Sequence, residues 1–189
     1  VMSIIEKMKG KRLPLATLFE NSTVEKLAKL IAADDEEIKW NSLVPIKTTG
    51  TKKPVYLIHG GGLNTLVFKS VSTYMDPDQP VYALQALGLN GKTTLYVTIE
   101  EIAAKYISEV LQVDPEGPYL LAGYSLGGKI AYEMTRQLIA SGKEVKMLGI
   151  FDTYAASSSR GIKKFMRKIR RQFNKVPFFY DQLVVGCLP

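Results

Sequence analysis

The sequence predicts an α/β protein in which helices cover both faces of a mostly parallel sheet. From Pro54 onward, short apolar runs alternate with longer amphipathic segments. Apolar residues make up 46% of the 189 residues, which is enough for one substantial core. No run approaches the about 20 consecutive apolar residues that span a bilayer, and the N-terminus lacks the pattern of a secretory signal. Together with a single cysteine, Cys187, these features predict a cytoplasmic protein.

Residues 1–33 are predicted to form two helices joined by a turn. The first ends near Lys9-Gly10, and the second begins at Ser22-Thr23-Val24-Glu25, which has the S-x-x-E form of a capping box. The second helix carries one apolar stripe, which is too small to form a core alone. Residues 34–53 are predicted to be a linker, because an acidic run precedes a stretch with Pro45, Gly50 and no helical periodicity.

Residues 54–189 are predicted to form the main domain. The predicted strands are Val55–Ile58, Val81–Leu84, Tyr119–Ala122 and Val145–Phe151. The predicted helices are Leu66–Tyr74, Ile99–Leu111 and Gly128–Ser141, the last ended by Gly142.

A serine flanked by glycines follows the third predicted strand. Gly123-Tyr124-Ser125-Leu126-Gly127 has the form G-x-S-x-G, and an amphipathic helix comes after it. In such a nucleophile elbow the serine occupies a strained turn, and Gly123 and Gly127 provide room where neighbouring backbone comes close. The helix N-terminus stabilises negative charge that develops at Ser125. We expect Ser125 to be a nucleophile, and a turn that binds a ligand or phosphate is the alternative.

A glycine-rich loop, His59-Gly60-Gly61-Gly62, directly follows the first predicted strand. An α/β-hydrolase places its second oxyanion-hole amide there. We expect the N–H groups of Leu126 and Gly61 to be the two donors. His59 is the only histidine, but it precedes the nucleophile, whereas this fold has the order Ser, Asp, His. We therefore predict a structural role for His59, with catalytic base as the alternative.

Asp152 follows the last predicted strand, at the edge of the sheet where α/β proteins place catalytic groups. We expect it to orient the catalytic histidine. A cap of an Asx-type turn at Asp152-Thr153 is the alternative structural role, and Asp181 is the alternative carboxylate.

Together these segments resemble the type I thioesterase domains at the end of nonribosomal peptide and polyketide synthetases, enzymes of secondary metabolite biosynthesis. Four marks carry the resemblance: Leu43-Val44-Pro45-Ile46, the segment from Pro54 to Gly61, the segment from Val81 to Gly88, and Gly117 to Gly128 followed by Phe151-Asp152. Residues 13–28 resemble the last half of an acyl or peptidyl carrier domain.

The resemblance implies an α/β-hydrolase fold, incomplete at the C-terminus, and a small helical carrier remnant in residues 1–33. It also implies that Ser125 takes an acyl or peptidyl chain from a carrier domain of the same synthetase and releases it by hydrolysis or cyclisation. In this family the catalytic aspartate follows the sixth strand, which supports Asp152, and the histidine lies beyond a lid insertion. The chain is then expected to end within the lid, truncated, with the histidine and the serine that carries 4′-phosphopantetheine outside it.

The net charge of +7 arises after Thr153, because the preceding residues carry equal numbers of basic and acidic side chains. This distribution argues against a general nucleic-acid surface. Residues 161–175 are predicted to form an amphipathic basic helix. Its possible roles are a lid over the acyl-binding cleft, a docking site for the carrier or its phosphate, and contact with a membrane surface.

Neither a metal nor a bound cofactor is expected. The sequence has no cluster of Cys, His and carboxylates at metal spacing, and it lacks the G-x-G-x-x-G pattern of a dinucleotide-binding reductase. Two other functions stay open. A free-standing serine esterase or lipase would use the same elbow, and a non-catalytic docking module would need no base.

Overall fold

The computed structural model describes residues 2–10, 13–14, 17–32, 40–87, 89 and 98–154. The predicted basic helix at 161–175 and Asp181 lie outside these residues. The chain divides into two compact units, which are described separately. No helix in the described ranges is long and apolar enough to cross a membrane.

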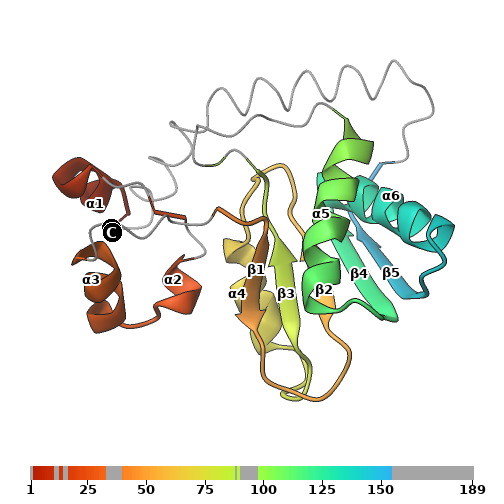
Figure 1. The fold of residues 1–189 in the computed structure, drawn as a ribbon, viewed down its shortest axis with the longest axis horizontal. Helices are drawn as coiled ribbons and strands as arrows, with labels where there is room; N and C mark the ends of the chain where they lie inside the picture. The colour runs from red at the N-terminus through yellow and green to blue at the C-terminus, as the bar shows by residue number, and fades with distance from the viewer. Residues whose placement is uncertain are drawn as a thin grey trace. The chain divides into compact units, whose positions relative to one another are not determined.

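The described part of the first unit is helical, with α1 at Met2–Lys9, α2 at Thr17–Glu20 and α3 at Val24–Ala32 (Figure 1). Leu13 is buried at its centre, and partly buried apolar side chains pack against it. These side chains are Ile5, Leu18, Leu27 and Ile31. The apolar stripe predicted for α3 thus supplies two of the residues around Leu13.

The start of α3 differs from the predicted capping box. The hydroxyl of Thr23, not Ser22, accepts a hydrogen bond from the backbone N–H of Lys26 at 3.2 Å. The helix begins one residue later than an S-x-x-E box at Ser22 requires, so Glu25 lies in its first turn and forms an exposed ion pair with Lys29. Thr23 provides the same kind of capping bond from the next position.

The second unit is built on a sheet that, among the described residues, has five strands in the order β1-β3-β2-β4-β5. The strands are β1 Leu43–Lys47, β2 Val55–Ile58, β3 Val81–Leu84, β4 Tyr119–Tyr124 and β5 Val145–Phe151. All neighbouring pairs are parallel except β1 and β3, which are antiparallel. The predicted fold class, a mostly parallel sheet with helices, is therefore confirmed.

Strand β1 lies inside the segment predicted to be a linker, residues 34–53. Val44 and Ile46 are buried, and their neighbours along the strand are partly exposed, which is the alternation of a strand with one face in the core. Pro45 obscured this pattern in the sequence. Proline is tolerated here because, among the described strands, β1 lies at the edge of the sheet, and its register is irregular between Pro45 and Lys47. Part of the predicted linker is thus a strand of the sheet.

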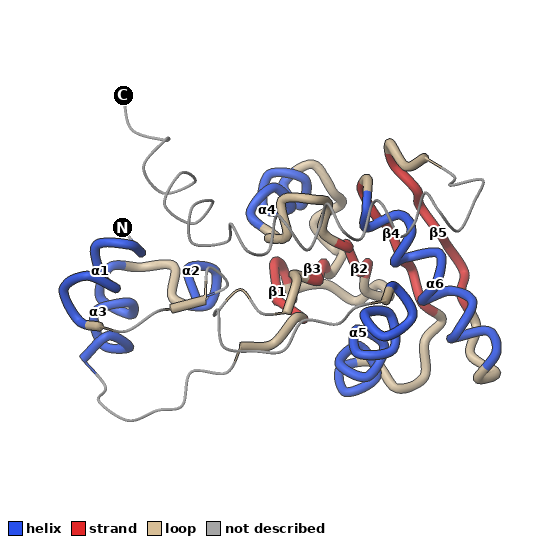
Figure 2. Tube along the Cα trace, turned by 90° about the horizontal axis from the view of Figure 1, so that it is seen from above, coloured by secondary structure: helices blue, strands red, loops and turns tan. Residues whose placement is uncertain are grey.

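Helices cover both faces of the sheet. Helix α4, Leu66–Thr73, lies on one face, and α5, Ile99–Val113, and α6, Leu126–Ala140, lie on the other (Figure 2). Thr98 and Glu101 form a capping box at the start of α5. The sequence pattern that corresponds to this box is T-x-x-E at residues 98–101. Helix α6 begins two residues before the predicted start because Ser125 itself is its N-cap residue.

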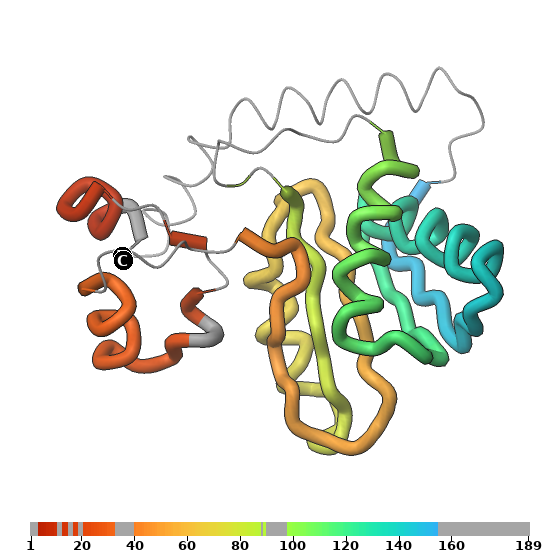
Figure 3. The backbone as a smooth tube through the Cα atoms, in the orientation of Figure 1, coloured from red at the N-terminus to blue at the C-terminus, as the bar shows by residue number. Residues whose placement is uncertain are grey.

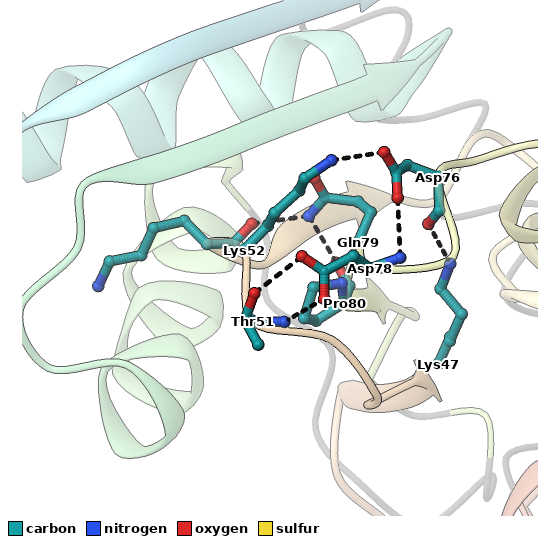
Figure 4. Close-up of polar contacts among 8 residues, drawn as sticks. Lys47, Thr51, Lys52, Asp76, Asp78, Gln79 and Pro80 are labelled. Atoms are coloured by element: carbon teal, nitrogen blue, oxygen red, sulfur yellow. Dashed lines mark hydrogen bonds and ion pairs between the residues drawn. The ribbon is translucent and has the colours of Figure 1, made fainter.

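The loop from β1 to β2 and the loop that enters β3 run beside each other at the amino-terminal ends of β2 and β3 (Figure 3). The Thr51 backbone N–H and hydroxyl both donate to the Asp78 carboxylate at 2.8 Å, and Lys52 forms an ion pair with Asp76 at 2.5 Å (Figure 4). We call this set of contacts the amino-end cluster. It joins two loops through side chains that are about half exposed at Lys52 and Asp76.

Candidate active site

Ser125 occupies a strained bend between β4 and α6. Its φ of 54° and ψ of −113° are unusual for a residue with a side chain, and its own side chain is partly exposed. The backbone N–H of Ser125 donates to the carbonyl of Phe151 at 2.8 Å. The bend is thus held by the neighbouring strand β5, and the serine lies at the carboxyl ends of the parallel strands.

The two glycines of the motif lie where the backbone is most crowded. A Cβ on Gly123 would come within 2.1 Å of the Gly127 carbonyl oxygen. A Cβ on Gly127 would come within 2.3 Å of the Ile58 carbonyl oxygen. Backbone atoms cannot yield to such contacts, so these positions exclude every residue except glycine. The start of α6 therefore packs directly on the end of β2.

That packing brings the glycine-rich loop next to the bend. Ile58, the last residue of β2, pairs with Gly123 of β4, so residues 59–62 leave the sheet beside Ser125. Leu126 is the first residue of α6, and an N–H in the first turn of a helix has no acceptor within the helix. Around Gly61, a Cβ would meet nothing within 4 Å. Both predicted oxyanion donors thus belong to segments that adjoin Ser125.

His59 is buried and makes hydrogen bonds at both ring nitrogens. Nδ1 lies 2.7 Å from the Gly60 carbonyl oxygen, and Nε2 lies 2.8 Å from the hydroxyl of Tyr106 on α5. Burial lowers the pKa of His59 to about 4, so the ring is neutral at pH 7. With both nitrogens occupied inside the protein, His59 is not placed to take a proton from Ser125. This geometry supports a structural role.

Asp152 lies directly after the residue of β5 that pairs with Tyr124, at the same end of the sheet as Ser125. It is exposed and has a φ of 49°. Among the described residues, no hydrogen bond to the Asp152 carboxylate is recorded, and its role as orienting carboxylate or turn cap stays a prediction. The Thr153 hydroxyl makes the local contact instead, donating to the Ser125 carbonyl at 2.8 Å.

Two residues that support the site were not predicted from the sequence. Thr153 connects the turn at Asp152 to the bend at Ser125. In the sequence, Thr153 is marked only by its position next to Asp152. Tyr106 contacts His59 from a helix 47 residues away, and no local pattern marks it. Among the described residues, no three His, Cys, Asp or Glu side chains group together as a metal site would require.

Comparison with known proteins identifies the class of domain. The model of the thioesterase domain family matches residues 53–176. The chain is 35% identical over 147 residues to the inactive atromentin synthetase invA3 of Paxillus involutus, covering 76% of this chain and 16% of that protein. It is also 35% identical over 154 residues to a dimodular nonribosomal peptide synthase of Bacillus subtilis, covering 82% of this chain and 6% of that protein.

A similar solved structure is that of holo-AB3403, a four-domain nonribosomal peptide synthetase bound to AMP and glycine. It has a TM-score of 0.63 and 34% identity over 82% of this chain and 12% of that one. The chain thus spans a small part of the length of each of these relatives. Because the family model covers more than half of the chain, and the strands, bend and helix have the predicted arrangement, the chain belongs to the thioesterase domain family.

Proposed function

We propose that this domain releases an acyl or peptidyl chain from the phosphopantetheine arm of a carrier domain. Ser125 Oγ attacks the thioester carbonyl, the C–S bond breaks, and the pantetheine thiol leaves with a proton. Water then cleaves the resulting ester and restores the serine, or an amine or hydroxyl of the bound chain does so and closes a ring. The observation that carries the proposal is the strained bend that holds Ser125 between β4 and α6.

The proposed roles of the other residues follow from their positions. The N–H groups of Leu126 and Gly61 would stabilise the negative oxygen of the tetrahedral intermediate. Asp152 would orient a histidine that acts as the general base. Because His59 is buried and bonded at both nitrogens, that histidine would come from outside the 189 residues.

The carrier is the proposed partner, and it favours this function over a free-standing esterase. The relatives described above are multidomain synthetases, and the helical unit before the sheet contains the segment that resembles a carrier domain. We propose that residues 1–33 are the C-terminal part of that carrier domain. The alternative of a non-catalytic docking module is favoured by one observation: a relative at 35% identity is an inactive synthetase.

The decisive experiment is to incubate the full-length protein that contains these residues with an acyl-pantetheine thioester. Mass spectrometry of its peptides should find the acyl group on Ser125, and Ser125→Ala should abolish the added mass. A docking module would show no added mass in the unsubstituted protein. An esterase would be acylated equally fast by simple esters that have no pantetheine.

Asp152→Asn tests the proposed orienting carboxylate. The substitution keeps the shape of the side chain but removes its charge, and it should slow turnover by about 10⁴-fold, as loss of the orienting charge does in other triads. Asp181→Asn is the matched control, since Asp181 is the alternative carboxylate. If Asp181→Asn slows turnover and Asp152→Asn does not, the assignment of Asp152 is wrong.

A further inference from the structure

We propose that the imidazole of His59 is a positioning group for the oxyanion hole. The imidazole holds the Gly60–Gly61 peptide so that the Gly61 N–H faces the acyl carbonyl at Ser125. The inference rests on the proposed function. It assigns a task to the histidine that the proposed triad does not use.

The orientation of one peptide plane is the first step. The Gly60 carbonyl and the Gly61 N–H belong to the same planar trans peptide, so they point in opposite directions. The Gly60 carbonyl oxygen lies 2.7 Å from His59 Nδ1 and accepts a second hydrogen bond from the Leu63 N–H at 3.0 Å. Two donors therefore fix the direction of this carbonyl, and the Gly61 N–H is directed the opposite way.

The tautomer of His59 is the second step. A carbonyl oxygen can only accept, so the 2.7 Å contact requires a proton on Nδ1. Nε2 then carries a lone pair, and the single proton of the Tyr106 hydroxyl is shared between Nε2 at 2.8 Å and the Gln85 carbonyl oxygen at 3.0 Å. Burial raises the pKa of Tyr106 well above its usual range, so this hydroxyl keeps its proton.

The attachment of the imidazole to the rest of the domain is the third step. Tyr106 is fully buried on α5, and its ring meets that of His59 edge to face. Gln85 directly follows β3, and the backbone N–H of His59 donates to the carbonyl of Leu84 at 3.1 Å. The loop is thus fastened to a strand and a helix that are already rigid. A donor held in place before the reaction stabilises the transition state without reorganisation.

Two substitutions at position 59 separate this role from mere packing. The amide nitrogen of Asn lies as many bonds from Cβ as Nδ1 does, so His59→Asn can still donate to the Gly60 carbonyl. The terminal group of Gln lies as far from Cβ as Nε2, so His59→Gln can reach Tyr106 but not Gly60. Only the first variant retains the proposed positioning bond.

The kinetic test uses the full-length protein and an acyl-pantetheine thioester. We expect His59→Gln to lower the acylation rate constant by about 10²-fold with KM little changed, which approaches the loss of an oxyanion donor. We expect His59→Asn to lose less than about tenfold. Equal losses in the two variants, or full activity of His59→Gln, would overturn the proposal.

Tyr106→Phe removes the hydroxyl that contacts Nε2 of His59. We expect its loss in the acylation rate constant to lie between the losses of His59→Asn and His59→Gln. Tyr119→Phe is its matched control. Tyr119 is also a buried tyrosine whose hydroxyl donates to a backbone carbonyl, that of Asp114 at 2.9 Å, but it lies at the amino end of β4. Tyr119→Phe should leave the acylation rate unchanged. An equal loss in both tyrosine variants would show that the effect is general destabilisation.

A measurement without substrate keeps this inference distinct from the proposed function. ¹⁵N spectra of histidine-labelled protein at pH 7 should show His59 protonated at Nδ1 and not at Nε2, with the signal assigned by its loss in His59→Gln. The Gly61 amide signal should shift in His59→Gln and much less in His59→Asn. A proton on Nε2 would overturn the inference, even if Ser125 is acylated. If Ser125 is never acylated, the proposed function fails, while these spectra still decide whether His59 holds the peptide.

Discussion

The two ends of the sheet are built in different ways. At the amino end of β2 and β3, the loops are joined by the amino-end cluster, in which Lys52 and Asp76 remain about half exposed. At the carboxyl end, the contacts are backbone contacts, such as that of Ser125 with Phe151, and hydrogen bonds of buried or partly buried side chains, such as that of His59 with Tyr106. The described residues other than glycine with positive φ are Leu63, Ser125 and Asp152, and each follows the carboxyl end of a parallel strand.

This difference shows where the fold accepts conformational strain. A positive φ at a residue other than glycine costs free energy, and this conformation persists only where neighbouring structure enforces it. At Ser125 the enforcing contacts are the hydrogen bonds with Phe151 and Thr153. The amino end has no non-glycine residue of this kind among those described. The strain is thus concentrated at the end where the proposed chemistry occurs.

The largest expected effect comes from placing a side chain on the crowded carboxyl end. Gly127→Ala puts a Cβ against the carbonyl oxygens of Ile58 and His59 and should lower the local free energy of unfolding by about 3 kcal/mol. Gly61→Ala is the matched variant in the neighbouring loop, where a Cβ meets nothing, and it should change stability by less than about 1 kcal/mol. Hydrogen exchange in β2 and β4, measured by mass spectrometry, gives both values. Similar losses in the two variants would contradict the comparison.

A second effect tests the buried histidine. The pKa of His59 is lowered to about 4 in the folded protein, against about 6.5 in the unfolded chain. The unfolded chain therefore binds the proton first, and the contribution of His59 is complete above about pH 6.5 and is lost as the pH falls to about 4. The full loss is about 3 kcal/mol.

Urea-dependent pulse proteolysis across this pH range measures that loss. Carboxylates also titrate in the same range, so the comparison is with His59→Asn, which has no titrating group at this position. The unsubstituted protein should lose more stability between pH 6.5 and 4 than the variant does. Parallel profiles would mean that the pKa of His59 is not lowered by folding.

The elements after Pro54 could be predicted because their patterns are local. Apolar runs of four to seven residues gave the strands, and G-x-S-x-G gave the bend before α6. The end of β4 was predicted two residues early, at Ala122, because its extension depends on pairing of Tyr124 with Phe151 of another strand. Strand β1 was missed because Pro45 and the turn residues around it resemble a loop.

For the candidate site, as for the fold, only the features that follow from local sequence patterns could be predicted. The sequence could point to Ser125, the glycines and Asp152 as candidates, since each lies in a short motif or directly after a strand, and their catalytic roles stay predictions. It could not reveal what holds them. The bonds from Thr153 to Ser125 and from Tyr106 to His59 join residues 28 and 47 positions apart. Such contacts follow from the packing of strands and helices, and a local pattern carries no information about them.

The smallest expected effect lies at the amino end. Lys52→Ala and Asp76→Ala break an ion pair between two half-exposed side chains, where water and salt screen most of the attraction. In scanning calorimetry each should shift the Tm of this domain by less than about 2 °C, and the coupling between them should vanish at high salt. Acylation of Ser125 should be unchanged, since the cluster lies at the opposite end of the sheet. A large loss of activity would mean that the two ends are coupled through β2 and β3, and the division of roles between them would have to be abandoned.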